Sequence, residues 1–434
     1  RTVPQAATRR EEAHAFRAAL ILGVTPCLAI AIGAVIFAPE VAHMFNASPE
    51  DEDRLESAIR IFAWALPLWA FVEIATSSLR AQRVFGPEIR LRVFWEQIIR
   101  LVFATLFWLL GWGFLGLLVA HLLSLALTAV LAARLSLKYF SVGDLVRGKA
   151  DGPIFWETAR AGLAIMPANL SQRFYSDGGV IALNWILPGT SGAVAAGLFT
   201  IARKISSLIQ AIRLAFAYVL SPLASALSRG AREEVQKIYG FATGVLVAIA
   251  LPAGMVLAAA APAILSLFGK QADPAVPAVM ILVGSRIVEA MAGAAQPIQQ
   301  VISSYRAQLV AANTGMIVAV IVGWFLLPEW GLTGMAIAVT AGLCTGAVLP
   351  VIQMWYDEGL TPFSDHSGRT LAITIGVAVV GAALAWLSNF LPDLISVPLT
   401  IALMLGSTWV ACRFALPYED RQALGKLGRA LRLV

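Results

Sequence analysis

The stretch LAITIGVAVVGAALAWLSNFL, at positions 371–391, runs for 21 residues without a charged side chain. A helix needs about 20 predominantly apolar residues to cross the hydrocarbon core of a bilayer. Similar blocks follow one another along the 434-residue chain, with short polar segments between them. This pattern predicts an all-α polytopic membrane protein.

The composition of the whole chain agrees with that prediction. Hydrophobic residues make up 59% of the sequence and charged residues only 13%, whereas a soluble domain carries about 25% charged residues. So little charge cannot cover a globule with polar surface, which excludes a soluble enzyme, a disordered protein and a nucleic-acid-binding domain. No nucleic acid is therefore expected as a partner, and the net charge of +6 is interpreted as loop topology.

Twelve apolar blocks are long enough to span a membrane. They lie at 16–37, 57–79, 93–110, 114–135, 155–186, 191–227, 239–265, 279–301, 308–327, 332–354, 371–391 and 395–416. The blocks at 155–186 and 191–227 exceed what a bilayer requires, so these helices are expected to tilt or protrude.

The loops between the blocks alternate in charge. Lys and Arg concentrate before the first block, in every second loop and after the last block, and such loops stay in the cytoplasm. Examples are Arg9, Arg80, Lys149 and Arg232, whereas Glu40, Asp51, Asp273, Glu329 and Asp393 lie in the opposite loops. The sequence predicts that both visible ends are cytoplasmic.

Three short motifs recur in order along the chain. SSLRAQ at 77–82 returns as SSYRAQ at 303–308, APEVAHMF at 38–45 as APAILSLF at 261–268, and WGFLG at 112–116 as WGLTG at 330–334. The offsets of 226, 223 and 218 residues nearly agree, which indicates two pseudo-symmetric helical lobes related by an axis along the membrane normal. The counterparts of the blocks at 155–186 and 191–227 would precede residue 1, so 14 spans are expected in the full-length protein.

The repeat sets the expected domain organisation. We expect an N-terminal lobe at 1–136 that lacks its first two spans, an inter-lobe cytoplasmic loop at 137–154 and a C-terminal lobe at 155–354. An extra helix pair follows at 355–416, and a basic amphipathic cytoplasmic tail at 417–434. In the tail, Leu424, Leu427 and Leu431 share one helical face, which predicts a short helix on the inner leaflet or, equally, a frayed solvated tail.

Motifs for covalent chemistry are missing from the sequence. It contains no phosphate-binding G-x-x-x-x-G-K-[ST] loop, and its longest loop is about twenty residues long, too short for a membrane glycosyltransferase site. The four histidines lack partners at metal-ligand spacing, and the three cysteines lie inside apolar blocks. We therefore expect a protein that is not an enzyme and needs no cofactor or metal.

Charged residues inside the spans are the best candidates for a functional site, because each costs a few kcal/mol to place in a bilayer. The basic ones are Arg100, Arg160, Arg173, Arg203, Lys204, Arg213 and Arg286, and the acidic ones are Glu73, Glu96, Asp177 and Glu289. At 1.5 Å per residue, Arg173, Arg203 and Arg286 lie near mid-depth. The surplus of arginine predicts a wet, cationic cavity between the lobes that suits phosphate or acidic-sugar groups.

Structural roles for the same residues stay open. Glu96–Arg100 and Arg173–Asp177 are spaced i,i+4 and Arg286–Glu289 i,i+3, so each could form an ion pair within one helix. Arg160 and Arg213 could extend to the inner headgroups, and Lys204 points about 100° away from Arg203. Glu73, Glu96, Asp177 and Glu289 are the candidates for ion coupling or pairing.

The segment AVAAGLFTIARKIS at 193–206, with Ser221 and Pro222 downstream, resembles the eighth span of polysaccharide (lipid-linked oligosaccharide) flippases. These form a branch of the multidrug/oligosaccharidyl-lipid/polysaccharide (MOP) exporter superfamily. The block at 155–186, with Asp177 near its end, is similar to their seventh span, and the repeated motifs are similar to family features.

The resemblance implies two six-helix lobes in a V shape in the bacterial inner membrane. It implies alternating access that moves an undecaprenyl-pyrophosphate-linked oligosaccharide, such as an O-antigen, exopolysaccharide or capsule repeat unit, between leaflets. Arg173, Arg203 and Arg286 would hold its pyrophosphate or sugar acids, and an ion gradient would drive the cycle. Membrane lipid, a polysaccharide polymerase and assembly proteins are the implied partners.

Three other functions remain open at this stage. A lipid II flippase would share the fold and a cationic cavity. A multidrug or organic-cation exporter would need acidic, aromatic-lined lobes, which the arginine surplus disfavours. A non-transporting membrane scaffold of a polysaccharide-synthesis complex would tolerate the loss of the cavity arginines.

Overall fold

The computed structural model describes residues 9–45, 49–81, 89–140, 152–226, 232–302, 305–363 and 366–433. All regular elements in these ranges are helices. Packing between the helices divides the chain into two compact units, Arg1–Pro167 and Ala168–Val434, called unit 1 and unit 2 below. The lobe boundaries expected from the repeat stay a prediction.

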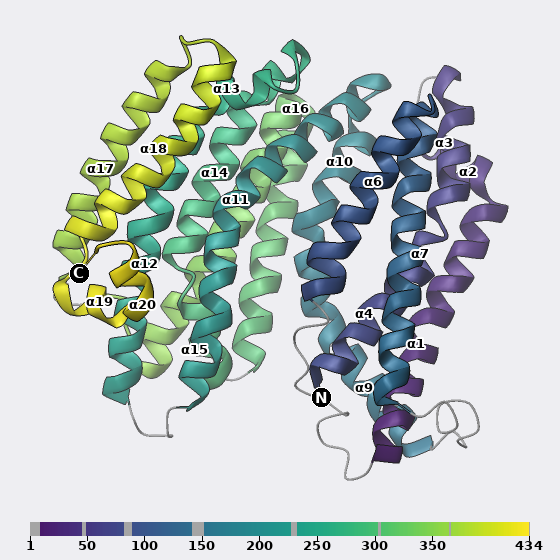
Figure 1. Cartoon of the computed structure of the whole chain (residues 1–434), viewed down its shortest axis with the longest axis horizontal. Helices are drawn as coiled ribbons and strands as arrows, with labels where there is room; N and C mark the ends of the chain where they lie inside the picture. The colour runs from purple at the N-terminus through teal and green to yellow at the C-terminus, as the bar shows by residue number, and fades with distance from the viewer. Residues whose placement is uncertain are drawn as a thin grey trace. The chain divides into compact units, whose positions relative to one another are not determined.

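Unit 1 is built on α4, which packs against α1 and α7, while α6 packs against α7 (Figure 1). Its core joins Phe16, Ala75 and Ala132, and Phe16 stacks on Phe140 with 4.6 Å between ring centroids. The elements are α1 (Arg9–Ile36), α2 (Ala38–His43), α3 (Pro49–Phe62), α4 (Ala65–Ala81), the π-helix η2 (Ile89–Trp95), α6 (Glu96–Leu109), α7 (Gly113–Tyr139) and α9 (Gly152–Arg173), which continues into unit 2.

Unit 2 is organised around α14, which packs against α11, α12 and α16, while α17 and α18 pack on α12. The core contains Phe199, Leu257, Leu282 and Val283. The elements are the π-helix η3 (Phe174–Gly178), α10 (Gly179–Ile186), α11 (Thr190–Ala226), α12 (Arg232–Ala259), α13 (Ala261–Ser266), the 3₁₀ helix η4 (Lys270–Ala275), α14 (Val276–Met291), α15 (Ala295–Ile302), α16 (Tyr305–Glu358), α17 (Ser367–Ser388), α18 (Asp393–Phe414), α19 (Tyr418–Ala423) and α20 (Gly425–Ala430).

All twelve predicted spans are largely helical in their described residues. Nine helical stretches in the described part of the chain are long and apolar enough to cross a membrane. One of them, α16, is two helices joined at Gly331, where φ is 49°, and therefore accounts for two predicted spans. The spans at 93–110 and 155–186 correspond to η2–α6 and α9–η3–α10, which π-helical turns interrupt.

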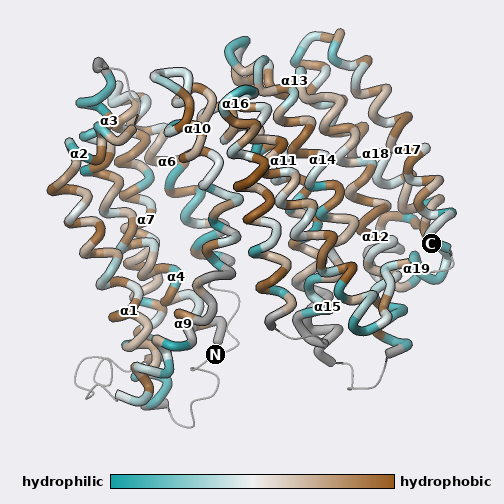
Figure 2. The backbone as a smooth tube through the Cα atoms, turned by 180° about the vertical axis from the view of Figure 1, so that it is seen from behind, coloured by the Kyte–Doolittle hydropathy of each residue, from teal (hydrophilic) through white to brown (hydrophobic). Residues whose placement is uncertain are grey.

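The helix α17, which contains the charge-free stretch, shows why this is a membrane protein. Its buried positions are small or polar: Thr370, Thr374, Ala378, Gly381, Ala385 and Ser388. Large apolar residues such as Val380, Leu384 and Leu387 are exposed instead. A soluble protein has the opposite pattern, whereas small residues at the helix contacts and apolar residues outside are typical of a bilayer. Apolar colour runs along most helices in Figure 2, and the chain is a multi-pass membrane protein.

Two of the three repeated motifs have matching local structures. The motifs at 38–45 and 261–268 each form a six-residue helix with proline in its first turn, α2 and α13. The Trp-Gly-x-x-Gly motifs each make a tight turn, because Gly113 and Gly331 have φ of 54° and 49°, a conformation that costs glycine little. The third motif lies partly outside the described residues. The internal repeat is therefore structural as well as sequential.

The C-terminal tail forms two short helices, α19 and α20. Gly425, with φ of 58°, separates α19 from α20. Leu433 is buried beside Val245 and Cys412, and its carbonyl accepts hydrogen bonds from Arg413 and Arg421. The left-handed glycine turns the chain back onto α18, and the place of the tail on the inner leaflet stays a prediction.

Candidate functional site

Glu289 of α14 bridges two arginines in unit 2. One carboxylate oxygen lies 2.5 Å from Nη1 of Arg286 on the same helix, and the other lies 2.9 Å from Nη2 of Arg213 on α11. The side chains of Arg286, Glu289 and Arg213 are only 7%, 12% and 14% exposed. The i,i+3 pair expected on α14 is present, and the structure adds Arg213 to it instead of extending Arg213 to the headgroups.

Gly293 leaves the space in which the Arg213 side chain lies. The aliphatic part of the Arg213 side chain crosses Gly293, at the turn between α14 and α15, so closely that a Cβ there would lie 2.7 Å from Cγ. The guanidinium then reaches Glu289 and also donates to the amide oxygen of Gln296 at 3.3 Å. A glycine at the end of α14 therefore lets a residue of α11 bond to two neighbouring helices.

Arg203 belongs to the same charged region. It is half-buried on α11, and the charges of Asp177 and Arg286 act on it. Asp177 lies 3.9 Å from Arg173, and both of these side chains are more than half exposed. The i,i+4 pair is present, but it is long and open to its surroundings. Unit 2 thus brings together Arg203, Arg213, Arg286 and Glu289, with Arg173 and Asp177 at its edge.

Three arginines of this region have unused hydrogen-bond donors. The Nε atoms of Arg203, Arg213 and Arg286 are buried and have no hydrogen-bond partner among the described residues. A buried donor without an acceptor costs about 1–3 kcal/mol. An edge of the guanidinium group that still lacks an acceptor is suited to the oxygens of a phosphate or carboxylate.

Tyr175 of the π-helix η3 is a further residue of this region, which no sequence motif indicated. Its ring lies where the two helices of α16 cross at Gly315 and Gly342, and a Cβ on Gly315 would be 2.7 Å from its hydroxyl oxygen. Close by, the Ser171 hydroxyl donates to Asn313 of α16 at 3.3 Å. The charge of Glu289 acts on Tyr175. Only the polar amide of Asn313 inside an apolar span hinted at this contact.

On α11, the polar residues other than Lys204 lie on the inner side, among buried apolar residues such as Ile205 and Ile209. Ser206 is buried, and Arg203, Ser207, Gln210 and Arg213 are partly buried. Lys204, Leu208, Ala211 and Leu214 are exposed. The polar face predicted from helical spacing is thus directed inward, and Lys204 lies away from the arginine cluster as expected.

The candidates in unit 1 form separate contacts. Arg100 donates to Glu96 at 2.5 Å and to Gln97 at 3.4 Å, all on α6. Glu73 of α4 pairs with Arg92 of η2 at 2.8 Å. Arg160 on α9 is exposed. Whether these residues face one cavity with the arginines of unit 2 stays a prediction.

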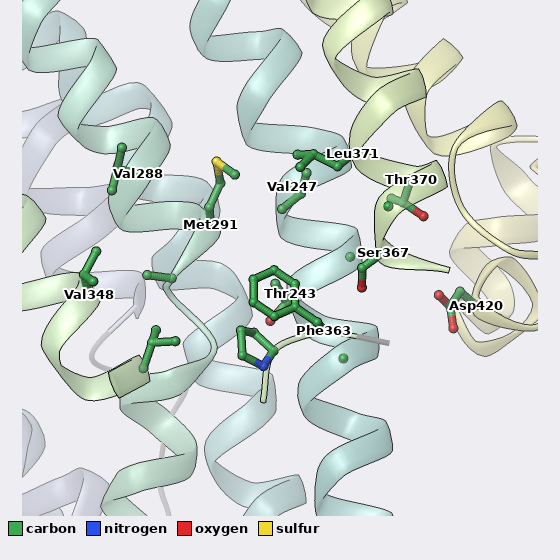
Figure 3. A pocket seen from close by; sticks show the side chains of 16 residues that line it. Thr243, Val247, Val288, Met291, Val348, Phe363, Ser367, Thr370, Leu371 and Asp420 are labelled. Carbon is green, nitrogen blue, oxygen red and sulfur yellow. The ribbon is translucent and has the colours of Figure 1, made fainter. Parts of the chain in front are cut away.

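An apolar cavity of about 380 Å³ lies in unit 2 (Figure 3). Its walls include Val247 of α12, Met291 of α14 and Leu371 of α17, and Asp420 of α19 lies at its edge. The buried hydroxyl of Thr243 has no hydrogen-bond partner among the described residues. Since α14 provides both Met291 and the Arg286–Glu289 pair, an apolar space and a cationic cluster share one helix.

The described residues contain no group of three or more His, Cys, Asp or Glu side chains that could hold a metal ion. The arrangement offers arginine donors, a carboxylate and an apolar cavity. Such a set can bind an anionic amphiphile.

Comparison with known proteins agrees with the architecture. A family model described as "Polysaccharide biosynthesis protein" matches residues 4–277. Among solved structures, the lipid II flippase MurJ in an inward-closed conformation superimposes with a TM-score of 0.70 and 13% sequence identity, covering 94% of this chain and 85% of that chain. A search of curated proteins finds no match. At this identity, the structural likeness establishes a shared fold.

Proposed function

The chain belongs to the polysaccharide biosynthesis protein family, and from this premise we propose that it flips a lipid-linked oligosaccharide across the bacterial inner membrane by alternating access. The substrate class proposed is an undecaprenyl-pyrophosphate-linked repeat unit. Both visible ends of the chain lie in the cytoplasm in this proposal, and the protein performs no covalent chemistry.

The arginine cluster of unit 2 carries the proposal. Counting Arg173 and Asp177 at its edge, the region has four arginines against two carboxylates, a surplus of two positive charges. Three of these arginines are Arg203, Arg213 and Arg286. Their buried Nε donors lack acceptors. A pyrophosphate linkage brings both the negative charge and the acceptor oxygens that this cluster lacks.

The apolar cavity supports a substrate with a lipid part. It is lined by Val288 and Met291 of α14 and by Ala292 directly after this helix, close in sequence to the Arg286–Glu289 pair. A cation exporter would have no use for a surplus of buried arginine, because like charges repel. The fold is shared with a lipid II flippase, so the experiment has to distinguish the sugar part of the substrate.

The test is deletion of the gene followed by complementation with the intact protein. Wild type and single Arg203→Ala, Arg213→Ala and Arg286→Ala variants are compared at matched expression. Surface polysaccharide and inner-leaflet lipid-linked oligosaccharide are measured. Arg369→Ala is the matched control, since Arg369 is an exposed arginine at the start of α17, outside the cluster.

We expect the deletion and the cluster variants to lose surface polymer and accumulate the lipid-linked precursor, while Arg369→Ala behaves as wild type. Lysis with accumulated lipid II would assign the protein to cell-wall synthesis instead. Normal polysaccharide with altered resistance to cationic drugs would make it an exporter. Full activity of every arginine variant would favour a scaffold.

A further inference from the structure

The bridge through Glu289 joins two helices of unit 2 and holds two arginines with one carboxylate, whereas the Glu73–Arg92 pair that joins α4 to η2 in unit 1 holds one. The bond of Glu289 to Arg286 stays within α14, whereas its bond to Arg213 crosses to α11, 76 positions earlier in the sequence. Glu96–Arg100 and Arg173–Asp177 each lie within one stretch of helix. Breaking the Arg213–Glu289 bond would therefore change what holds α11 to α14.

The carboxylate of Glu289 and the oxygens of a phosphate compete for the same donors. Both accept charge-assisted hydrogen bonds from guanidinium groups, and a phosphate brings more charge and more acceptor oxygens. Arg213 still has a buried Nε without a partner. A phosphate that approaches this edge gains a bond that Glu289 does not supply.

Displacement from Arg213 would not leave Glu289 without a counter-charge. Its second oxygen is bonded to Arg286, one turn away on the same helix. The exchange therefore costs less than freeing a buried carboxylate outright, which would leave an unpaired charge in a low-dielectric interior. The Arg213–Glu289 bond can therefore break while the Arg286–Glu289 bond remains.

From this geometry we infer that Glu289 is a resident counter-anion that the anionic group of the substrate displaces from Arg213, releasing the link between α11 and α14. The inference rests on the proposed function and adds a role for Glu289. It is a positioning residue, which holds Arg213 ready for the substrate and does not bind the substrate itself. A ligand shifts a conformational equilibrium only by binding one state better, and here the state with the broken bridge offers a free Arg213.

The test uses the intact protein in detergent micelles and farnesyl pyrophosphate as the probe. Farnesol, which lacks the pyrophosphate, is the control ligand. Dissociation constants are measured for wild type, Glu289→Gln and Asp177→Asn. The last removes the same charge near Arg203, but from a side chain that is 55% exposed and makes no bond between α11 and α14.

Glu289→Gln is expected to bind farnesyl pyrophosphate about tenfold more tightly, the effect of removing one charge-assisted competitor. Asp177→Asn should change the affinity less than about threefold, since Asp177 is bonded to Arg173 and its removal frees no donor of Arg213 or Arg286. In complementation, Glu289→Gln should lower transport although it binds better, because the bridge can no longer re-form and expel the substrate. A merely structural glutamate would lose binding and transport together.

A second measurement uses only the wild type, so it tests the role of Glu289 even if Glu289→Gln does not fold. In wild type, farnesyl pyrophosphate should increase backbone hydrogen exchange at the turn between α14 and α15, because Arg213 leaves Glu289 and Gln296 there. Farnesol should not. Reduced exchange at this turn would show that the bridge tightens, and would overturn the inference.

The remaining outcomes separate the two proposals. Equal or weaker binding by Glu289→Gln, or an equal gain in Asp177→Asn, overturns the role of Glu289 while the proposed function stands. If neither wild type nor Glu289→Gln binds farnesyl pyrophosphate, the cluster is not a pyrophosphate site, and the role of Glu289 fails with it.

Discussion

Replacing Gly293 by alanine tests how the arginine cluster is positioned. The added Cβ would lie 2.7 Å from Cγ and 2.9 Å from Cδ of Arg213, closer than carbon atoms can approach. These atoms are in the middle of the side chain, so the guanidinium cannot stay on Glu289 and Gln296 while the stem moves aside. The substitution therefore acts on Arg213 without changing any charge.

The expected loss of stability is the cost of the less unfavourable of two responses of Arg213 to the added Cβ. Holding Arg213 in place strains the packing, which costs about 1–3 kcal/mol. Letting it swing away forfeits a hydrogen bond between charged groups, which costs about 1.5–3 kcal/mol. We expect a loss of about 1–3 kcal/mol in the free energy of unfolding of unit 2. In a domain of comparable size, the thermal midpoint falls by roughly 2–4 °C per kcal/mol.

The assay is thermal unfolding in detergent, followed by the loss of helical circular dichroism, together with complementation. Gly284→Ala, inside α14, is the control, because a Cβ there meets nothing within 4 Å. Alanine is a better helix former than glycine by up to about 1 kcal/mol, so the control should be neutral or slightly more stable. Complementation should fall with Gly293→Ala and stay normal with Gly284→Ala.

A double-mutant cycle identifies Arg213 as the cause. In the Arg213→Ala background the Cγ and Cδ atoms are absent, so the added Cβ no longer meets them. Gly293→Ala should therefore cost about 1–2 kcal/mol less than in wild type, because the effects of contacting residues are coupled. If the cost is the same in both backgrounds, or if Gly293→Ala is as harmless as Gly284→Ala, the reasoning about Arg213 is refuted.

Three further predictions concern other parts of unit 2. Gly315→Ala should destabilise far more than Gly346→Ala in the same melting assay, because its Cβ would lie 2.6 Å from the backbone oxygen of Gly342, whereas at Gly346 the nearest atom is 3.8 Å away. Trp409→Phe removes the indole donor to the carbonyl of Leu431 at 2.9 Å and should weaken tail docking by about 0.5–1.5 kcal/mol, seen as faster hydrogen exchange over residues 425–433. Burial, and then the charge of Glu419, raise the pKa of Asp420 above its ordinary 3.8, and His366 opposes this effect. The tail should therefore dock best below about pH 4 and less well as the pH rises through the raised pKa. Limited proteolysis of the tail measures this dependence on pH, and Asp420→Asn should abolish it.

The sequence predicted those features that depend on neighbours along the chain. Span positions follow from runs of apolar residues, and the pairs Glu96–Arg100, Arg173–Asp177 and Arg286–Glu289 follow from helical spacing. The break at Gly331 lies between the predicted spans at 308–327 and 332–354. In each case the determining interaction lies within a few residues.

The link between Arg213 and Glu289 could not be predicted in this way. It depends on the rotation and height of α11 against α14, which are set by the packing of residues such as Ile209 and Ile287. The role of Gly293 was also hidden, because a glycine at the end of a helix is usually a terminator. The break between α19 and α20 was hidden too, because the leucine spacing is helical and does not show that Gly425 adopts a left-handed turn.

The cost of the arginine cluster is itself an argument for function. A buried ion pair is often no more stabilising than apolar residues of the same volume, and the region, counting Arg173, holds four arginines against the two carboxylates of Asp177 and Glu289. Stability alone would favour replacing Arg203 and Arg213 with leucine, as on the outer side of α11, where Leu208 and Leu214 are exposed. Arginines held between α11 and α14 with unused donors make sense if an anion arrives during the cycle. The prediction for Gly293 tests this directly, because it disturbs the position of one arginine and leaves every charge in the protein unchanged.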